Sequence, residues 1–157
     1  MKNFPFTHQP DAMDCGPACL SMIAEHYGKR YTLEYLRDNS FIGRDGVSLL
    51  GISKAAENIG FKTVGDRVTF EKLAEKALLP SIVHSNQDHF VVVYKIKKKR
   101  KCYEIYVADP GKGLLTYTKE EFCSHWVSTQ TNGEEKGVAL LLEREFGIKK
   151  ASKKVVI

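Results

Sequence analysis

The sequence has few prolines, few cysteines and no long apolar run, and each of these shortages excludes a class of protein. No segment approaches the roughly 20 apolar residues that a membrane-spanning helix needs, and the opening residues MKNFPFTHQP lack the apolar centre of a secretory signal peptide. With only 5 prolines and 43% hydrophobic residues among 157, the composition is that of a folded chain. We therefore expect one soluble domain whose thiols stay reduced in a cytosolic setting.

The spacing of the cysteines and the charge balance exclude two kinds of binding site. The four cysteines, at positions 15, 19, 102 and 123, form no CxxC pair and have no matching histidine pair, so no zinc site is predicted. The formal net charge of +5 is mild. Because no basic stretch interleaved with aromatic residues accompanies it, no nucleic-acid partner is predicted.

The order of the predicted elements indicates an α+β fold, with N-terminal helices packed on a C-terminal antiparallel β-sheet. Apolar residues at helical spacing, with start and stop signals, predict helices over residues 15–27, 33–37, 49–59 and 69–77. Strand patterns occupy residues 61–68, 81–85, 89–96, 102–108, 114–117 and 137–143. Thr118-Lys-Glu-Glu121 is typical of a capping box and predicts a further helix that contains Trp126. We expect residues 1–146 to form the domain and the basic residues 147–157 to form a linker or tail.

Cys15 lies in the first turn of the first predicted helix, where a thiol has a reason to be reactive. Partial positive charge and unpaired N–H groups at a helix start favour a thiolate. Gly16 leaves the approach to the sulfur open, and Pro17 is tolerated in a first turn. Asp14 or a neighbour is expected to cap the helix. A free cysteine is also commonly a small buried residue, so position alone leaves both interpretations open.

A predicted hairpin supplies the base that a reactive thiol needs. If the polar run 97–101 is the turn, centred near Lys99, the numbers of paired residues sum to about 198, which sets His89 opposite Asp109. The aspartate would orient the imidazole, and the imidazole would exchange the thiol proton. A slip of one residue would send the two side chains to opposite faces. Asp109 also begins Asp-Pro-Gly-Lys-Gly, and a turn role is compatible with the first.

Two other polar residues enter the argument with weaker support. His84 is the rival base, because a turn after Ser85 would place it across from His89 on the same face. It has no carboxylate opposite, so a structural strand histidine is the favoured interpretation. Gln9 precedes Cys15 closely enough for its side-chain amide, with the Cys15 N–H, to bind the oxyanion of a tetrahedral intermediate. A solvated loop glutamine is the default alternative.

Three segments, residues 9–20, 88–92 and 107–113, resemble those of the bacteriocin-processing cysteine endopeptidases. These are papain-like domains, usually found at the N-terminus of peptidase-containing ABC exporters, and the resemblance runs from about Phe4 to Leu142. It implies that Cys15 is the nucleophile, His89 the general base and acid, Asp109 the residue that orients His89, and Gln9 the oxyanion-hole glutamine. Cys19 matches a second cysteine of the family, which we interpret as a packing residue.

The same resemblance implies a substrate, partners and a location. The expected reaction is cleavage of a peptide precursor after the double glycine that ends its leader. The expected partners are that precursor and the transmembrane and nucleotide-binding domains of an ABC exporter, and ATP is expected only at the latter. The expected location is the cytoplasmic face of the bacterial cell membrane, or the cytoplasm for an isolated domain.

Alternatives of other classes stay open at this point. One is a domain that holds the leader without cutting it, and another is a papain-like acyltransferase or hydrolase that acts on a different substrate. The basic turn 97–101 is interpreted as a solvated turn, with contact to anionic lipid headgroups as the alternative.

Overall fold

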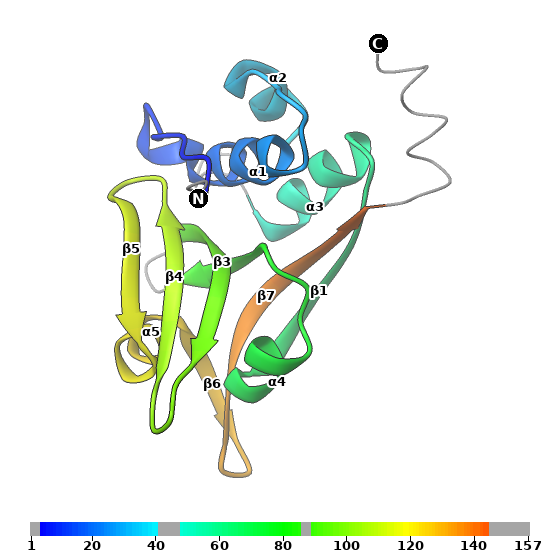
Figure 1. Ribbon diagram of the computed structural model, residues 1–157. Coiled ribbons are helices and arrows are strands. Elements are labelled where there is room, and N and C mark those ends of the chain that lie inside the picture. Colours follow the sequence, from blue (N-terminus) through cyan, green and yellow to red (C-terminus); the bar gives the residue numbers. More distant parts are fainter. Residues whose placement is uncertain (1–3, 41–47, 86–88, 145–157) are drawn as a thin grey trace.

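The computed structural model describes residues 4–40, 48–85 and 89–144, within which seven antiparallel strands form one sheet (Figure 1). The strands are β1 (Phe61–Thr69), β2 (Ser81–Ser85), β3 (His89–Lys98), β4 (Tyr103–Asp109), β5 (Gly113–Thr118), β6 (Val127–Thr131) and β7 (Glu134–Arg144). Their order is β1-β7-β2-β3-β4-β5, and β6 pairs with β7. Strands β2 to β5 follow one another along the chain and lie side by side in the same order.

The helices lie at two ends of the sheet. They are α1 (Cys15–His26), α2 (Leu33–Asp38), α3 (Leu49–Asn58), α4 (Phe70–Glu75) and α5 (Lys119–Trp126), with a single 3-10 turn, η1 (Ala12–Asp14), before α1. Figure 1 shows α1, α2 and α3 gathered at one end of the molecule, and α4 and α5 near the other. The predicted α+β arrangement is confirmed, although α4 and α5 interrupt the run of strands.

The sequence signals at helix starts act as predicted. Side-chain hydroxyls cap four helices by accepting a hydrogen bond from the backbone N–H three residues later, namely Thr32, Ser48, Thr69 and Thr118. At α5 the Glu121 carboxylate also accepts from the Thr118 N–H, so the predicted capping box is confirmed. The unpredicted strand β6 reads Val-Ser-Thr-Gln-Thr, with one apolar residue, and it forms by pairing with β7. The predicted tail 147–157 lies outside the described residues.

Helix α1 is the buried centre of the apolar layer above the sheet. Its first ten residues are all buried, and it packs against β3. Cys19 has no exposed surface, and its Sγ donates a hydrogen bond to the Phe90 carbonyl at 3.4 Å. Burial raises the pKa of the Cys19 thiol well above its usual value, so this cysteine is a packing residue, as predicted. The contact fixes α1 against the residue that follows His89.

Gly137 is the position in the fold where a single added methyl group should be most disruptive. A Cβ at Gly137 would overlap the ring of Trp126, a fully buried side chain whose Nε1–H donates to the Val138 carbonyl at 2.9 Å. Gly137→Ala is therefore expected to lower the free energy of unfolding by about 1–3 kcal/mol in urea titrations. The exposed neighbour Glu135→Ala is the control and should change it by less than about 0.5 kcal/mol. Equal stability of both variants would contradict the packing described here.

Candidate active site

Cys15 is the first residue of α1, so the predicted position of the thiol at a helix start is confirmed. Its neighbours Gly16 and Pro17 form the first turn, and all three residues are buried, with Cys15 only 5% exposed. Figure 1 shows the start of α1 above the end of the sheet where β4 finishes. The helix N-terminus therefore directs its partial positive charge at a sulfur that little solvent reaches.

His89 and Asp109 form a hydrogen-bonded pair in the described structure. The Nε2 atom of His89 lies 2.7 Å from Oδ1 of Asp109, at the start of β3 and the end of β4. The same carboxylate oxygen accepts the Gly111 N–H at 2.8 Å, so the orienting role and the turn role coexist. The side chain of Asp109 is nearly covered, at 6% exposure, whereas the side chain of His89 is 29% exposed. The imidazole is thus held from its buried side.

The electrostatics of the pair favour an ionised state. The hydrogen bond to Asp109, and then the one to Cys15, raise the pKa of His89 to about 9, although burial works in the other direction. Burial raises the pKa of Asp109, but the hydrogen bonds from His89 and from the Gly111 N–H outweigh it and lower that pKa below its usual value. The arrangement therefore keeps a protonated imidazole beside an ionised carboxylate at neutral pH.

The hairpin brings His89 and Asp109 together by a register that differs from the predicted one. Near the turn, paired numbers sum to 201, as in Lys98 with Tyr103; beyond an irregularity between Val93 and Lys95 they sum to 200, as in Val92 with Ala108. The predicted sum of about 198 was therefore wrong. A sum of 201 throughout would have sent residues 89 and 109 to opposite faces. The bulge restores the parity, and the two side chains meet as diagonal neighbours.

His84, the alternative base, lies outside the site. His84 pairs with Phe90, and Ser85 pairs with His89, so the predicted pairing of His84 with His89 was wrong by one residue. The His84 ring instead contacts the Phe90 ring, with 4.8 Å between the ring centres. Because adjacent positions of a strand face opposite sides of a sheet, His84 lies on the other face from His89.

Gln9 lies beside the Asp109 turn. Its backbone N–H donates to the Pro110 carbonyl at 2.9 Å, and its Oε1 would lie 3.6 Å from a Cβ at Gly111, which would also be 3.8 Å from Cε1 of His89. Its Nε2 donates to the Asp11 carbonyl at 3.0 Å, and Oε1 is buried without a hydrogen-bond partner among the described residues. The amide that the oxyanion role requires is therefore in place, but its N–H group is engaged elsewhere.

Asp14 and Arg37 form a contact that sequence reasoning missed. The predicted cap was Asp14 or a neighbour. Asp14 occupies the N-cap position of α1 but its side chain makes no capping hydrogen bond, whereas the Asp11 side chain accepts the Met13 N–H at the start of η1. Both carboxylate oxygens instead accept from the guanidinium of Arg37 on α2, at 2.8 and 3.0 Å. One signal in the sequence could have indicated it: an acidic residue directly precedes the reactive thiol, and its charge disfavours a thiolate unless a cation lies nearby.

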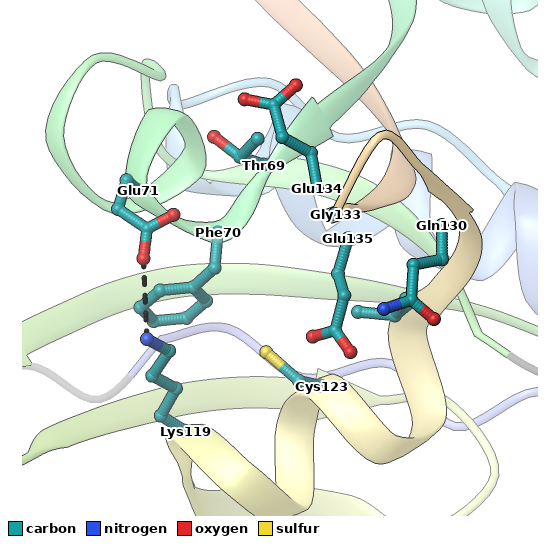
Figure 2. Close-up of a pocket in the computed structure, with 10 residues that line it drawn as sticks. Thr69, Phe70, Glu71, Lys119, Cys123, Gln130, Gly133, Glu134 and Glu135 are labelled. Atoms are coloured by element: carbon teal, nitrogen blue, oxygen red, sulfur yellow. Dashed lines mark hydrogen bonds and ion pairs between the residues drawn. The ribbon is translucent and has the colours of Figure 1, made fainter.

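A cavity of about 330 Å³ lies apart from these residues (Figure 2). It is formed by α4, α5 and the turn between β6 and β7, with side chains that include Phe70, Glu71, Lys119, Cys123 and Glu135. Lys119 pairs with Glu71 at 3.3 Å across it, and burial raises the pKa of Cys123. Gly113, which pairs with Asp109, is the first residue of β5, and α5 follows the other end of that strand. The cavity beside α5 is therefore away from Asp109, and we assign it no part in chemistry at Cys15.

Two searches of the described residues complete the site. No group of three or more histidine, cysteine, aspartate or glutamate side chains is arranged to hold a metal ion in that part of the chain. None of the helices found between residues 4 and 144, gaps aside, combines the length and the apolar character that crossing a membrane requires.

Comparison with known proteins finds a family over most of the chain. The Peptidase C39 family matches residues 3–136. The Lactococcin-G-processing and transport ATP-binding protein LagD of Lactococcus lactis subsp. lactis is 40% identical over 124 residues, which cover 76% of this chain and 17% of LagD. The Colicin V secretion/processing ATP-binding protein CvaB of Escherichia coli is 35% identical over 127 residues, which cover 80% of this chain and 17% of CvaB. The chain thus spans about a sixth of the length of these two relatives.

Solved structures share the fold. A double glycine motif protease from an AMS/PCAT transporter, in complex with the leader peptide, has a TM-score of 0.75 and 33% identity, covering 90% of this chain and 91% of that one. The peptidase domain of Streptococcus ComA, a bi-functional ABC transporter involved in a quorum sensing pathway, has a TM-score of 0.74 and 29% identity, covering 91% and 100%. The likeness therefore extends over nearly the whole of both structures.

Proposed function

The chain belongs to the Peptidase C39 family, and from this premise we propose that it is a cysteine endopeptidase that removes the leader of a bacteriocin-like precursor by cutting after a double glycine. The observation that carries the proposal is the 2.7 Å contact of His89 with Asp109, on a ring whose pKa Cys15, at the start of α1, also raises. A thiol, an imidazole and a carboxylate in that order are the groups that carry out nucleophilic acyl transfer.

The proposed reaction follows from the order of these contacts. Since Asp109 engages Nε2 of His89, Nδ1 is the nitrogen left for the thiol. The Cys15 thiolate attacks the carbonyl carbon of the second glycine, and the protonated His89 gives its proton to the leaving amine as the peptide bond breaks. Neutral His89 then takes a proton from water, which attacks the thioester and releases the leader. Asp109 stays ionised and holds the ring throughout.

The burial of the thiol supports a substrate with small residues at the cut. Only 5% of Cys15 is exposed, and the adjoining Gly16 and Pro17 are buried too. A carbonyl carbon must come within about 3–3.5 Å of the sulfur to react. Two glycines before the bond place no side chain between that carbonyl and the protein. The double-glycine protease structure in complex with a leader peptide, at 33% identity, supports the same substrate class.

The proposal is tested with a synthetic precursor that carries a double glycine and with a matched precursor that has valine at both positions. We expect mass spectrometry to find one cut, after the second glycine, in the first peptide only. Binding of the leader without any cut would favour the domain that holds leaders, and a product joined to an added amine would favour an acyltransferase. Cleavage of both peptides at equal rates would contradict the role assigned to the glycines.

Gln9 is proposed to supply the side-chain N–H of the oxyanion hole. The role requires Nε2 to leave the Asp11 carbonyl and turn toward the substrate, which the unpaired Oε1 makes less costly. Gln9→Ala is expected to reduce kcat about 100- to 1,000-fold while leaving measurable turnover, as for loss of one oxyanion donor. Full turnover by a folded Gln9→Ala protein, followed by mass spectrometry of the products, would show that the role is assigned wrongly.

We further propose that the natural partners are the transport domains of an ABC exporter. LagD and CvaB carry transport and ATP-binding functions in their names, and this chain matches 17% of each. ATP would then act on a separate nucleotide-binding domain, and the peptidase would work at the cytoplasmic membrane face. The basic residues 97–101, at the end of β3 and in the turn that follows it, are exposed, and Lys99 pairs with Glu104 at 3.1 Å. Their contact with anionic lipid is a prediction that these facts leave untested.

A further inference from the structure

The residue directly before the proposed nucleophile is a buried carboxylate. Asp14 is 2% exposed and occupies the N-cap position of α1. A carboxylate in this position could accept the Gly16 N–H, whereas Pro17, one residue later, has no N–H to donate. Asp14 makes no such bond, and its two oxygens are held by Nε and Nη2 of Arg37 at 2.8 and 3.0 Å.

The direction matters because a carboxylate and a thiolate would compete for the same place. Both are stabilised by the unpaired N–H groups and the partial positive charge at a helix start. Each also repels the other, since like charges at close range disfavour ionisation of both. An Asp14 carboxylate without a cationic partner would therefore oppose a thiolate on Cys15. The ion pair with Arg37 neutralises the carboxylate and leaves the helix start to the sulfur.

The short helix α2 is built to hold Arg37 in this position. Thr32 caps it by accepting the Tyr35 N–H, and Leu36, with no exposed surface, anchors it in the core. The planar guanidinium bonds both carboxylate oxygens in parallel, which a lysine ammonium does not do. The side chain of Arg37 is 41% exposed, but its partner is buried, so the contact is shielded on the Asp14 side.

We propose that Arg37 is a positioning residue of the active site, which keeps Cys15 reactive by holding and neutralising the Asp14 carboxylate beside it. The inference rests on the proposed function only in taking Cys15 as the nucleophile. The other ionisable groups that act on this region are His89 from β3, Asp109 from β4 and Cys19 from α1, with Asp11 and Asp38 beside Arg37. None of these is changed in the experiment that follows.

The test measures alkylation of Cys15 by iodoacetamide across pH, with mass spectrometry to separate it from the other cysteines. The variant Arg37→Gln leaves Asp14 without its partner, and the double variant Asp14→Asn with Arg37→Gln removes both charges. We expect Arg37→Gln to slow alkylation at pH 7 about tenfold and to move the rise of the rate to higher pH by about one unit. The double variant should regain at least half of the wild-type rate, because no carboxylate then competes with the thiolate.

Controls separate this role from a purely structural one. Arg30→Gln removes an exposed arginine whose contact with Glu25 spans 3.7 Å, and it should leave the profile unchanged. If Arg37→Gln does not fold, as judged by circular dichroism, Arg37→Lys takes its place and should alkylate more slowly than wild type. A folded Arg37→Gln protein with the wild-type profile would overturn the proposal. A double variant as slow as Arg37→Gln would overturn it too.

The readout also separates failure of this inference from failure of the proposed function. Alkylation uses no precursor, so an altered profile in Arg37→Gln would stand even if no double-glycine peptide were cleaved. Conversely, cleavage by the wild type with an unchanged alkylation profile in Arg37→Gln would leave the endopeptidase in place and remove only the role of Arg37.

Discussion

Replacing Cys15 with alanine is expected to abolish cleavage of a double-glycine precursor, with a fall in rate of about 10,000-fold or more. The covalent route is lost outright, because alanine has no atom that can form the thioester. The peptide products are followed by mass spectrometry. Leader binding should survive, because the substitution removes one sulfur atom from a residue that stays at a helix start.

Other cysteines provide the controls for this prediction. Cys102 is exposed, in the turn between β3 and β4, so Cys102→Ala should cleave at the wild-type rate. Cys19→Ala removes a buried side chain and the bond to the Phe90 carbonyl, so it should lower stability while retaining turnover in the folded fraction. Cleavage by Cys15→Ala at the rate of the Cys102 variant would remove the proposed endopeptidase mechanism.

Replacing His89 with alanine is expected to reduce kcat about 100- to 10,000-fold, which is the usual contribution of general acid–base catalysis. The loss combines two effects. The leaving amine no longer receives a proton, and the thiolate loses its hydrogen-bonding partner. His84→Ala is the matched control, because its ring lies against Phe90 on the other face of β3 and should not affect the proton transfer. Equal losses in the two variants would contradict the assignment.

The pH dependence of the wild type follows from the same residue. The pKa of His89 is raised to about 9, so in the folded protein the ring stays protonated at neutral pH and loses its proton as pH rises through about 9. The stability that this shift contributes is complete below the ordinary pKa near 6.5 and is lost between there and about 9. Cleavage and the stability contributed by His89 should both decline over that upper range. Asp109→Asn keeps an acceptor for the Gly111 N–H but removes the charge. Its alkaline decline should therefore move toward neutral pH.

The local parts of the fold could be predicted because their causes lie close together in the sequence. The hydroxyl of Thr118 and the carboxylate of Glu121 indicate the start of α5. Gly16, Pro17 and the apolar spacing indicate the helix that starts at Cys15. Strand β6 was missed because its residues Val127–Thr131 are mostly polar and form a strand by pairing with β7. Pairing across the sheet supplies what the local pattern lacks.

The site could be named from the sequence, but its geometry could not. The residues Cys15, His89 and Asp109 follow from chemistry and family resemblance, whereas their assembly depends on a bulge between Val93 and Lys95 that no turn signal announces. The partner of Asp14 was missed for a similar reason. Arg37 looks like any exposed arginine on a short helix until α2 is placed beside the start of α1.

The contact of Cys19 on α1 with Phe90, the residue after His89, has a consequence for when the site can form. His89 and Asp109 are 20 residues apart on one hairpin, so they can meet early, whereas the Cys19–Phe90 contact that brings the thiol into line spans 71 residues. A chain still emerging from the ribosome carries the sulfur long before it carries the hairpin. The thiol and its base therefore come together only when α1 has docked on the hairpin.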